Sequence, residues 1–231
     1  MPIVPKLYPR HIKYLFAMTI VLLSGCAAYY PQAVDIPLIE EKGDLRIDCG
    51  GFLAPPVNGE GGTVGGHWTV SYGITNMIAG QIYLGMDLLM RPHIQFAPGL
   101  FKGFENKTVV ELYSGYGYGV GSWNSDYKRG KNNYHLAFAQ FNIGKTGISD
   151  ANIDYGLGLK GGYIFSNDEI DTFNDIHQKS GPIVEPSVFI RFGSKRVKFY
   201  TKVNYLWTKT VSDQYYFPLS ISMGVNLHFQ L

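Results

Sequence analysis

The sequence has 231 residues, enough for one domain of ordinary size. Only 16% of the residues are charged, against roughly 25% in typical soluble domains, whereas glycine (28 residues) and tyrosine (17 residues) are abundant. The net charge of +2 is close to neutral, so nothing indicates a nucleic-acid partner. A chain rich in Tyr and Gly and poor in charge is typical of strands, tight turns and aromatic belts at a membrane interface.

The N-terminus has the pattern of a bacterial secretion leader. Three basic residues and no acid precede an apolar run at 14–23, which is too short to span a bilayer as a helix. Leu23, Ser24 and Gly25 then lead to Cys26. This stretch resembles the lipobox of bacterial lipoproteins, and the resemblance implies cleavage after residue 25 and acylation of Cys26. The alternative is an ordinary leader that happens to contain a cysteine.

The residues after Cys26 bear on sorting and on domain organisation. No Asp follows the cysteine directly, so the resemblance to lipoproteins implies transfer to the outer membrane. The stretch 26–42 has no sustained period and reads as a lipidated N-terminus and periplasmic tether. The sequence thus predicts a signal peptide at 1–25, this tether, and one β-barrel domain at 43–231. Cys49 would remain as a small apolar side chain in a strand.

The body of the chain alternates apolar and polar residues, which places one class on each face of a strand. In the last segment, 219–231, every odd-numbered residue is apolar and every even-numbered one is polar or glycine. The same alternation is present in 67–75, 152–165 and 197–208. It favours an all-β fold.

Ten strands can be placed along this pattern. They lie near 44–54, 64–74, 78–89, 93–103, 107–121, 131–144, 151–165, 182–193, 196–208 and 215–231. Short turns alternate with longer links at 55–63, 122–130, 166–181 and 209–214, apart from a brief one at 90–92. Outer-membrane barrels combine such alternation with an even strand number, so both termini are expected on the periplasmic side. The segment 93–103 contains Pro98 and Gly99, and its loss with another segment would leave eight strands.

A soluble sandwich or lipocalin also alternates, with its apolar face inward. Aromatic residues near the strand ends favour lipid instead, because barrels carry aromatic girdles at both interfaces. In hydrocarbon only a closed barrel pairs every backbone group. The predicted fold is therefore a closed antiparallel up-and-down transmembrane β-barrel.

The C-terminal stretch resembles the signal that the barrel-assembly machinery recognises. Its Gly224, Leu227 and Phe229 match that pattern, although Gln230 and Leu231 follow where the usual signal ends on the aromatic. With the lipobox, the chain resembles small Gram-negative outer-membrane β-barrel proteins that carry a lipoprotein leader. The resemblance implies partners in the barrel-assembly and lipoprotein-sorting machinery and in outer-membrane lipid, and no particular substrate.

Charged residues on the polar face are expected to line the lumen. A ten-strand barrel is narrow, so buried charges must pair or be hydrated. Either a salt-bridged plug or a small pore or ligand cavity could result, and the pattern leaves both open. The predicted lumen network comprises Asp44, Arg46, Asp48, Glu111, Asp154, Lys160, Glu185, Arg191, Lys198 and Lys202.

The predicted loop 166–181 is the most distinctive one. Its Asp168, Asp171 and Asp175 are weak candidates for a divalent cation, because the spacing of a calcium loop is missing. Asp175 and His177 form an isolated Asp-x-His, and no HExxH or G-x-S-x-G motif occurs. We therefore expect no catalytic residues, no metal and no cofactor.

The sequence favours a lipid-anchored outer-membrane barrel with a structural, adhesive or envelope-interaction role and no enzymatic activity. The alternative is a narrow solute channel or small-ligand-binding barrel. A third possibility is an outer-membrane hydrolase that uses the loop 166–181. The pattern names no substrate and no oligomeric state.

Overall fold

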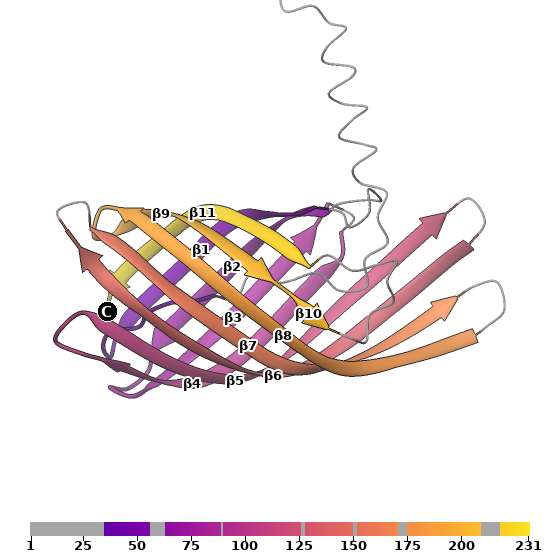
Figure 1. The fold of residues 1–231 in the computed structure, drawn as a ribbon, viewed down its shortest axis with the longest axis horizontal. Helices are drawn as coiled ribbons and strands as arrows, with labels where there is room; N and C mark the ends of the chain where they lie inside the picture. Colours follow the sequence, from indigo (N-terminus) through magenta and orange to yellow (C-terminus); the bar gives the residue numbers. More distant parts are fainter. Residues whose placement is uncertain are drawn as a thin grey trace, which may run out of the picture.

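The computed structural model describes residues 35–55, 63–88, 90–125, 128–149, 152–170, 175–208 and 218–231. These residues form one antiparallel sheet that closes on itself, with an irregular segment, 35–43, before the first strand (Figure 1). Cys26 and its lipobox lie outside the described residues. Within the described ranges, no helix has the length and apolar character needed to cross a membrane.

The strands follow one another around the sheet in chain order. They are β1 (Asp44–Ala54), β2 (Thr63–Gly73), β3 (Ile78–Asp87), β4 (Pro92–Gly103), β5 (Thr108–Ser125), β6 (Lys128–Ile148), β7 (Ile153–Ile170), β8 (Asp175–Gly193), β9 (Val197–Tyr205), β10 (Trp207–Thr208) and β11 (Leu219–Gln230). The strand β10 continues β9 after a break at Leu206, and both pair with β8. The strands β9 and β10 therefore count as one strand of the barrel wall, which has ten strands in all.

The first and last strands close the barrel. The strand β1 pairs with β11 from Asp44 opposite Gln230 to Leu53 opposite Ile221. The amide of Leu231 adds a hydrogen bond of 3.0 Å to the carbonyl of Gly43. The prediction of a closed antiparallel up-and-down barrel with ten strands is confirmed.

The predicted alternation separates the two faces of the wall. In β9, Lys198, Tyr200 and Lys202 point inward and are buried, whereas Phe199 and Tyr205 are exposed on the outside. The weakest predicted strand, 93–103, forms as β4, in which the alternate residues His93, Gln95, Ala97 and Phe101 are buried. Pro98 lies on its outer face.

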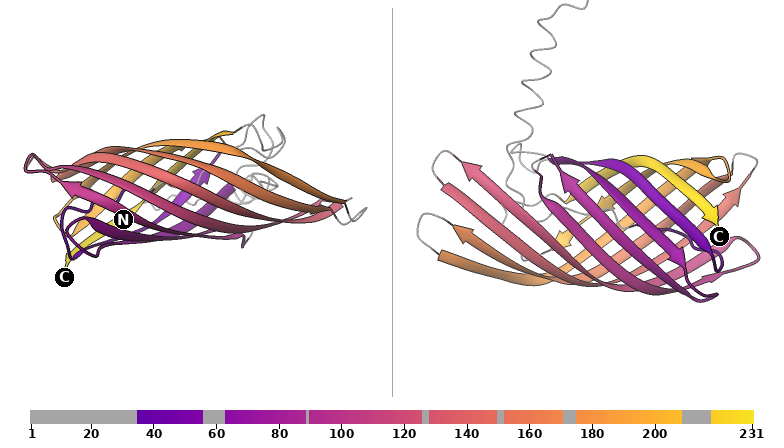
Figure 2. Two further views of the ribbon diagram at one scale, coloured as in Figure 1. Left: turned by 90° about the horizontal axis from the view of Figure 1, so that it is seen from below. Right: turned by 180° about the vertical axis from the view of Figure 1, so that it is seen from behind.

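The two ends of the barrel differ. One end, here called the turn end, holds Asp44, the C-terminus and the links from β2 to β3, β4 to β5, β6 to β7 and β8 to β9. At the opposite end the β5–β6 and β7–β8 hairpins project beyond the other strands, as Figure 1 and the right-hand view of Figure 2 show. The C label in both figures marks the turn end.

Two predicted long links are wrong. The expected link 122–130 is mostly strand, because β5 runs to Ser125 and β6 begins at Lys128. The expected loop 166–181 is likewise strand up to Ile170 and again from Asp175. The sequence of these projecting parts does not alternate apolar and polar residues, so the pattern that predicts a strand is missing there although the backbone pairing continues.

Residues 35–39 lie inside the barrel, whereas Glu40, Glu41 and Lys42 are exposed at its turn end. Ile36, Leu38 and Ile39 are fully buried, the first two beside Val109 and Phe189 of the wall. The sequence alone predicts that these residues belong to a periplasmic tether. Their apolar side chains bury area against the inner wall, which explains why the segment lies in the lumen and not in solvent.

Candidate functional site

The lumen is strongly charged. All ten side chains of the predicted lumen network are buried on the inner face, each with an exposed fraction of 5% or less. Buried charges of this kind are tolerated when they are paired and hydrogen-bonded. Their partners therefore decide what the lumen can do.

Two cations and two carboxylates meet half-way along the lumen. Arg191 lies 3.3 Å from Asp48, and Lys202 lies 2.7 Å from Asp35. Each cation also approaches the other carboxylate, at 3.6 Å for Lys202 to Asp48 and 3.9 Å for Arg191 to Asp35. Asn226 donates a further hydrogen bond of 2.9 Å to Asp48. The four charges thus form a balanced cluster.

This cluster holds the segment 35–43 in place. The Arg191 guanidinium donates to the carbonyls of Ile36 (2.6 Å) and Pro37 (3.2 Å). One level closer to the turn end, Glu111 accepts the backbone N–H of Ile39 at 2.8 Å. Charge-assisted bonds from the wall therefore satisfy the backbone of the inserted segment.

The sequence pattern does not predict a place for Asp35 in the lumen. It accepts from Lys202, and its carbonyl accepts the amide of Gln140 at 2.6 Å, so its backbone is bonded across the lumen as well. Burial, together with repulsion from the Asp48 carboxylate, raises the pKa of Asp35. The signal in the sequence is the apolar run after Asp35, which is unusual for a tether in water.

Toward the opposite end, aromatic and polar side chains fill the lumen. His93 bonds to Tyr134 and to Gln95, and Gln95 accepts from Lys160 at 3.1 Å. Lys160 also pairs with Glu185 at 3.5 Å. These side chains are hydrogen-bonded or ion-paired to one another. In the part of the chain that is described, no group of three or more His, Cys, Asp or Glu residues could hold a metal ion.

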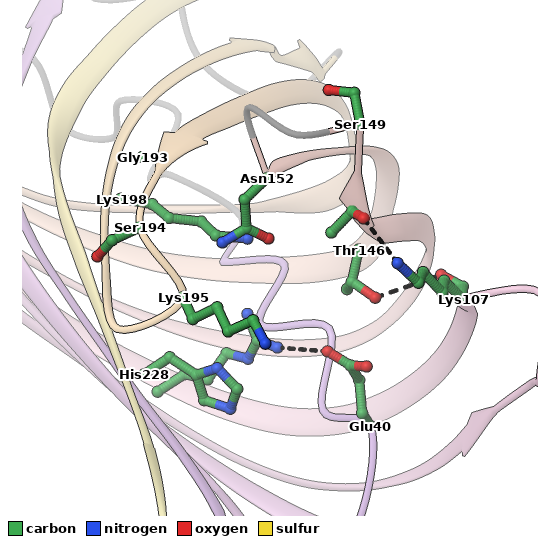
Figure 3. A pocket seen from close by; sticks show the side chains of 12 residues that line it. Glu40, Lys107, Thr146, Ser149, Asn152, Gly193, Ser194, Lys195, Lys198 and His228 are labelled. Atoms are coloured by element: carbon green, nitrogen blue, oxygen red, sulfur yellow. Dashed lines mark hydrogen bonds and ion pairs between the residues drawn. The ribbon is translucent and has the colours of Figure 1, made fainter.

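A polar pocket opens at the turn end. Its volume is about 590 Å³, and most of its lining comes from the turns and from the inner face of β1, β9 and β11. Figure 3 shows Lys195 and Lys198 extending into it from the β8–β9 side, with Lys107 and Thr146 on the facing side. The lining residues are Glu40, Arg46, Lys107, Thr146, Gly147, Ser149, Asn152, Gly193, Ser194, Lys195, Lys198 and His228.

The acids in and beside this pocket are already paired. Glu40 accepts from Arg46 at 3.0 Å, and Asp154 accepts from Lys198 at 2.5 Å. Asp44 accepts the backbone N–H of Glu40 at 2.7 Å and contacts His228 at 3.1 Å. Two lysines, Lys107 and Lys195, form no ion pair among the described residues, so the pocket carries unneutralised positive charge.

Two buried donors of the pocket have no hydrogen-bond partner among the described residues. They are the Nε of Arg46 and the Nδ2 of Asn152. A buried donor without a partner costs roughly 1–3 kcal/mol. A bound group that accepts hydrogen bonds would recover this free energy.

The predicted assembly signal lies in β11, where Gly224 faces Gly50 of β1 across the seam. Leu227 and Phe229 follow on the same strand, opposite Ile47 and Leu45. The predicted lipobox residues Leu23, Ser24, Gly25 and Cys26 lie outside the described residues. The cation candidate Asp171 does too, and the side chains of Asp168 and Asp175 are not among those described.

The chain matches no known family model, and no curated protein is significantly similar to it. The fold is therefore established by the barrel itself, and any function has to be argued from the geometry of this chain.

Proposed function

We propose that the chain is an outer-membrane barrel, lipid-anchored through Cys26, that acts in the cell envelope as a structural or interaction protein with a filled lumen. Conduction and catalysis are not part of this role. The observation that carries the proposal is an inverted distribution of polarity. Charged side chains are buried inside the barrel, and large apolar side chains are exposed outside.

The outer face supports a lipid environment. Exposed apolar side chains occur on every one of the ten strands of the wall, among them Trp68, Ile82, Phe96, Leu157 and Phe199. Monomeric soluble proteins rarely expose contiguous apolar patches larger than a few hundred Å². An apolar band around the whole barrel is instead the surface expected of a barrel in a bilayer.

The inner face supports a filled lumen. The segment 35–43 lies half-way into the barrel and is bonded to Arg191, Lys202 and Glu111 of the wall. Moving it out would uncover the buried Ile36, Leu38 and Ile39 and remove Asp35, which would leave Arg191 and Lys202 with Asp48 as their one shared carboxylate among the described residues. Such a segment is a permanent part of the structure and blocks the lumen at this level.

Membrane embedding is tested on envelope membranes from cells that express the full chain. We expect the protein to require detergent for extraction and to migrate faster on a gel before boiling than after it, because a closed barrel resists unfolding in detergent. Metabolic labelling with a palmitate analogue is expected to mark the wild type and not Cys26→Ser. Extraction without detergent would overturn the proposal.

The filled lumen is tested by planar-bilayer conductance. The wild type is expected to give no stable single-channel steps. The triple variant Ile36→Asp, Leu38→Asp, Ile39→Asp places three carboxylates in an apolar site and should expel the segment, so that steps occur. Lys42→Asp, at an exposed position of the same segment, is the control and should stay silent. Regular steps from the wild type would contradict the proposal and favour the narrow channel.

A further inference from the structure

We infer that the pocket at the turn end binds a phosphorylated saccharide. The inference deepens the proposed function, because it names the chemistry of an envelope component that this barrel could hold, and it rests on that function for the barrel's place in the envelope.

The charge favours an oxyanion. Four cationic side chains line the pocket, and among the described residues that line it the only acid is Glu40, which Arg46 neutralises. Lys198 is neutralised by Asp154. Within the described part of the chain, no carboxylate forms an ion pair with Lys107 or Lys195. Arg and Lys are the residues that proteins use for phosphate, through charge-assisted hydrogen bonds.

The available donors favour the same ligand. Among the described residues, the Nε of Arg46 and the Nδ2 of Asn152 are buried without a partner, and the Arg46 side chain is only 2% exposed. Lys107 donates one of its three N–H groups to the carbonyl of Gly147, at 2.8 Å, which leaves two N–H groups for a ligand. A phosphoryl group offers several acceptor oxygens to such a set of donors.

The rest of the lining suits a sugar. Ser149, Ser194 and Thr146 bring hydroxyl groups to the pocket. Its volume of about 590 Å³ is far larger than a phosphate ion needs and lies within the range of roughly 300–1,000 Å³ for small-molecule sites. Most such sites are lined by apolar residues, whereas this one is lined mostly by polar residues whose carbon atoms also reach its surface, so it fits a ligand that carries both polar groups and C–H faces, as a sugar does.

The rim of the pocket is fixed before any ligand binds. Lys107, Ser149 and Asn152 have φ angles of 60°, 63° and 49°, a backbone region that costs a residue other than glycine free energy. The amide of Thr146 donates to the carbonyl of Lys107 at 3.0 Å, which ties the β4–β5 turn to the end of β6. A fixed rim reduces the entropy lost on binding.

The experiment is isothermal titration calorimetry on the full chain folded in detergent micelles. We expect glucose 6-phosphate to bind, glucose not to bind, and inorganic phosphate to bind more weakly than glucose 6-phosphate. The double variant Lys107→Glu, Lys195→Glu should weaken glucose 6-phosphate binding at least tenfold. Lys102→Glu is the control, because it reverses the charge of one lysine on the outer face of β4, away from the pocket, and it should bind like the wild type.

A phosphorylated glycolipid carries the same headgroup chemistry as a free sugar phosphate. Displacement of glucose 6-phosphate by lipid A in the same micelles would identify the glycolipid as the source, and no displacement would leave the free sugar phosphate. Equal affinity for glucose and glucose 6-phosphate, or an unchanged affinity in the double variant, would overturn the inference. Because folding is checked first by heat-modifiable migration, such a result leaves the proposed membrane barrel intact.

Discussion

At the scale of single residues, Arg191 connects the inserted segment to the wall. It is fully buried and donates to two carbonyls of the segment as well as to Asp48. Arg191→Leu would leave Asp48 and Asp35 with one cation between them, and removing one partner of a buried ion pair costs about 3–5 kcal/mol. We expect a loss of this size in the free energy of unfolding, measured by guanidinium titration in micelles.

The matched control for Arg191 is Arg196, an exposed arginine of the β8–β9 turn. Arg196→Leu removes the same charge, and surface substitutions usually change stability by less than about 0.5 kcal/mol. Equal shifts of the unfolding midpoint in the two variants would show that the cluster around Arg191 does not hold the segment.

At the scale of elements, the seam between β1 and β11 depends on two facing glycines. A Cβ atom on Gly224 would lie 2.6 Å from the Cα of Gly50 and 2.7 Å from the hydroxyl of Tyr200, which itself bonds to His67 at 2.8 Å. Gly224→Ala should therefore push the closing strands apart and cost about 1–3 kcal/mol. The fraction of heat-modifiable protein after refolding is the measurement.

A second glycine provides the control for the seam. A Cβ atom on Gly161 of β7 would meet nothing within 4 Å, and alanine loses less backbone entropy than glycine when a strand forms. Gly161→Ala should fold at least as well as the wild type. If Gly224→Ala refolds equally well, the packing explanation for Gly224 fails, and only its resemblance to the assembly signal remains.

The elements also show what a sequence can predict. A strand such as β9, whose two faces meet different surroundings, is predicted by the alternation of apolar and polar residues along it. All ten strands of the wall were predicted from this alternation. The outer parts of β5 to β8 were missed because their sequence does not alternate apolar and polar residues. The segment 35–43 was missed because it contacts the wall in an irregular conformation without sheet pairing, and no periodicity in the sequence indicates that contact. The pocket at the turn end is lined by residues from turns that are far apart in the sequence. These residues become neighbours only when the barrel closes, so the sequence pattern does not predict the pocket.

At the scale of the whole molecule, the exposed apolar band allows a test of whether lipid or water surrounds the barrel. Leu159 lies near the middle of the outer face of β7, between Tyr155 and Tyr163, and is 49% exposed. In a bilayer, Leu159→Arg would place a charge in hydrocarbon and cost about 2–4 kcal/mol, whereas in water the same exposed position would tolerate arginine. We expect the unfolding free energy in lipid vesicles to fall by about that amount.

The control is Leu231→Arg, at a leucine that is 77% exposed beside the turn end, and it should change the unfolding free energy little. Since both variants add one arginine at an exposed leucine, a difference between them can come only from what surrounds the barrel at each position, and equal stabilities would mean that water surrounds both.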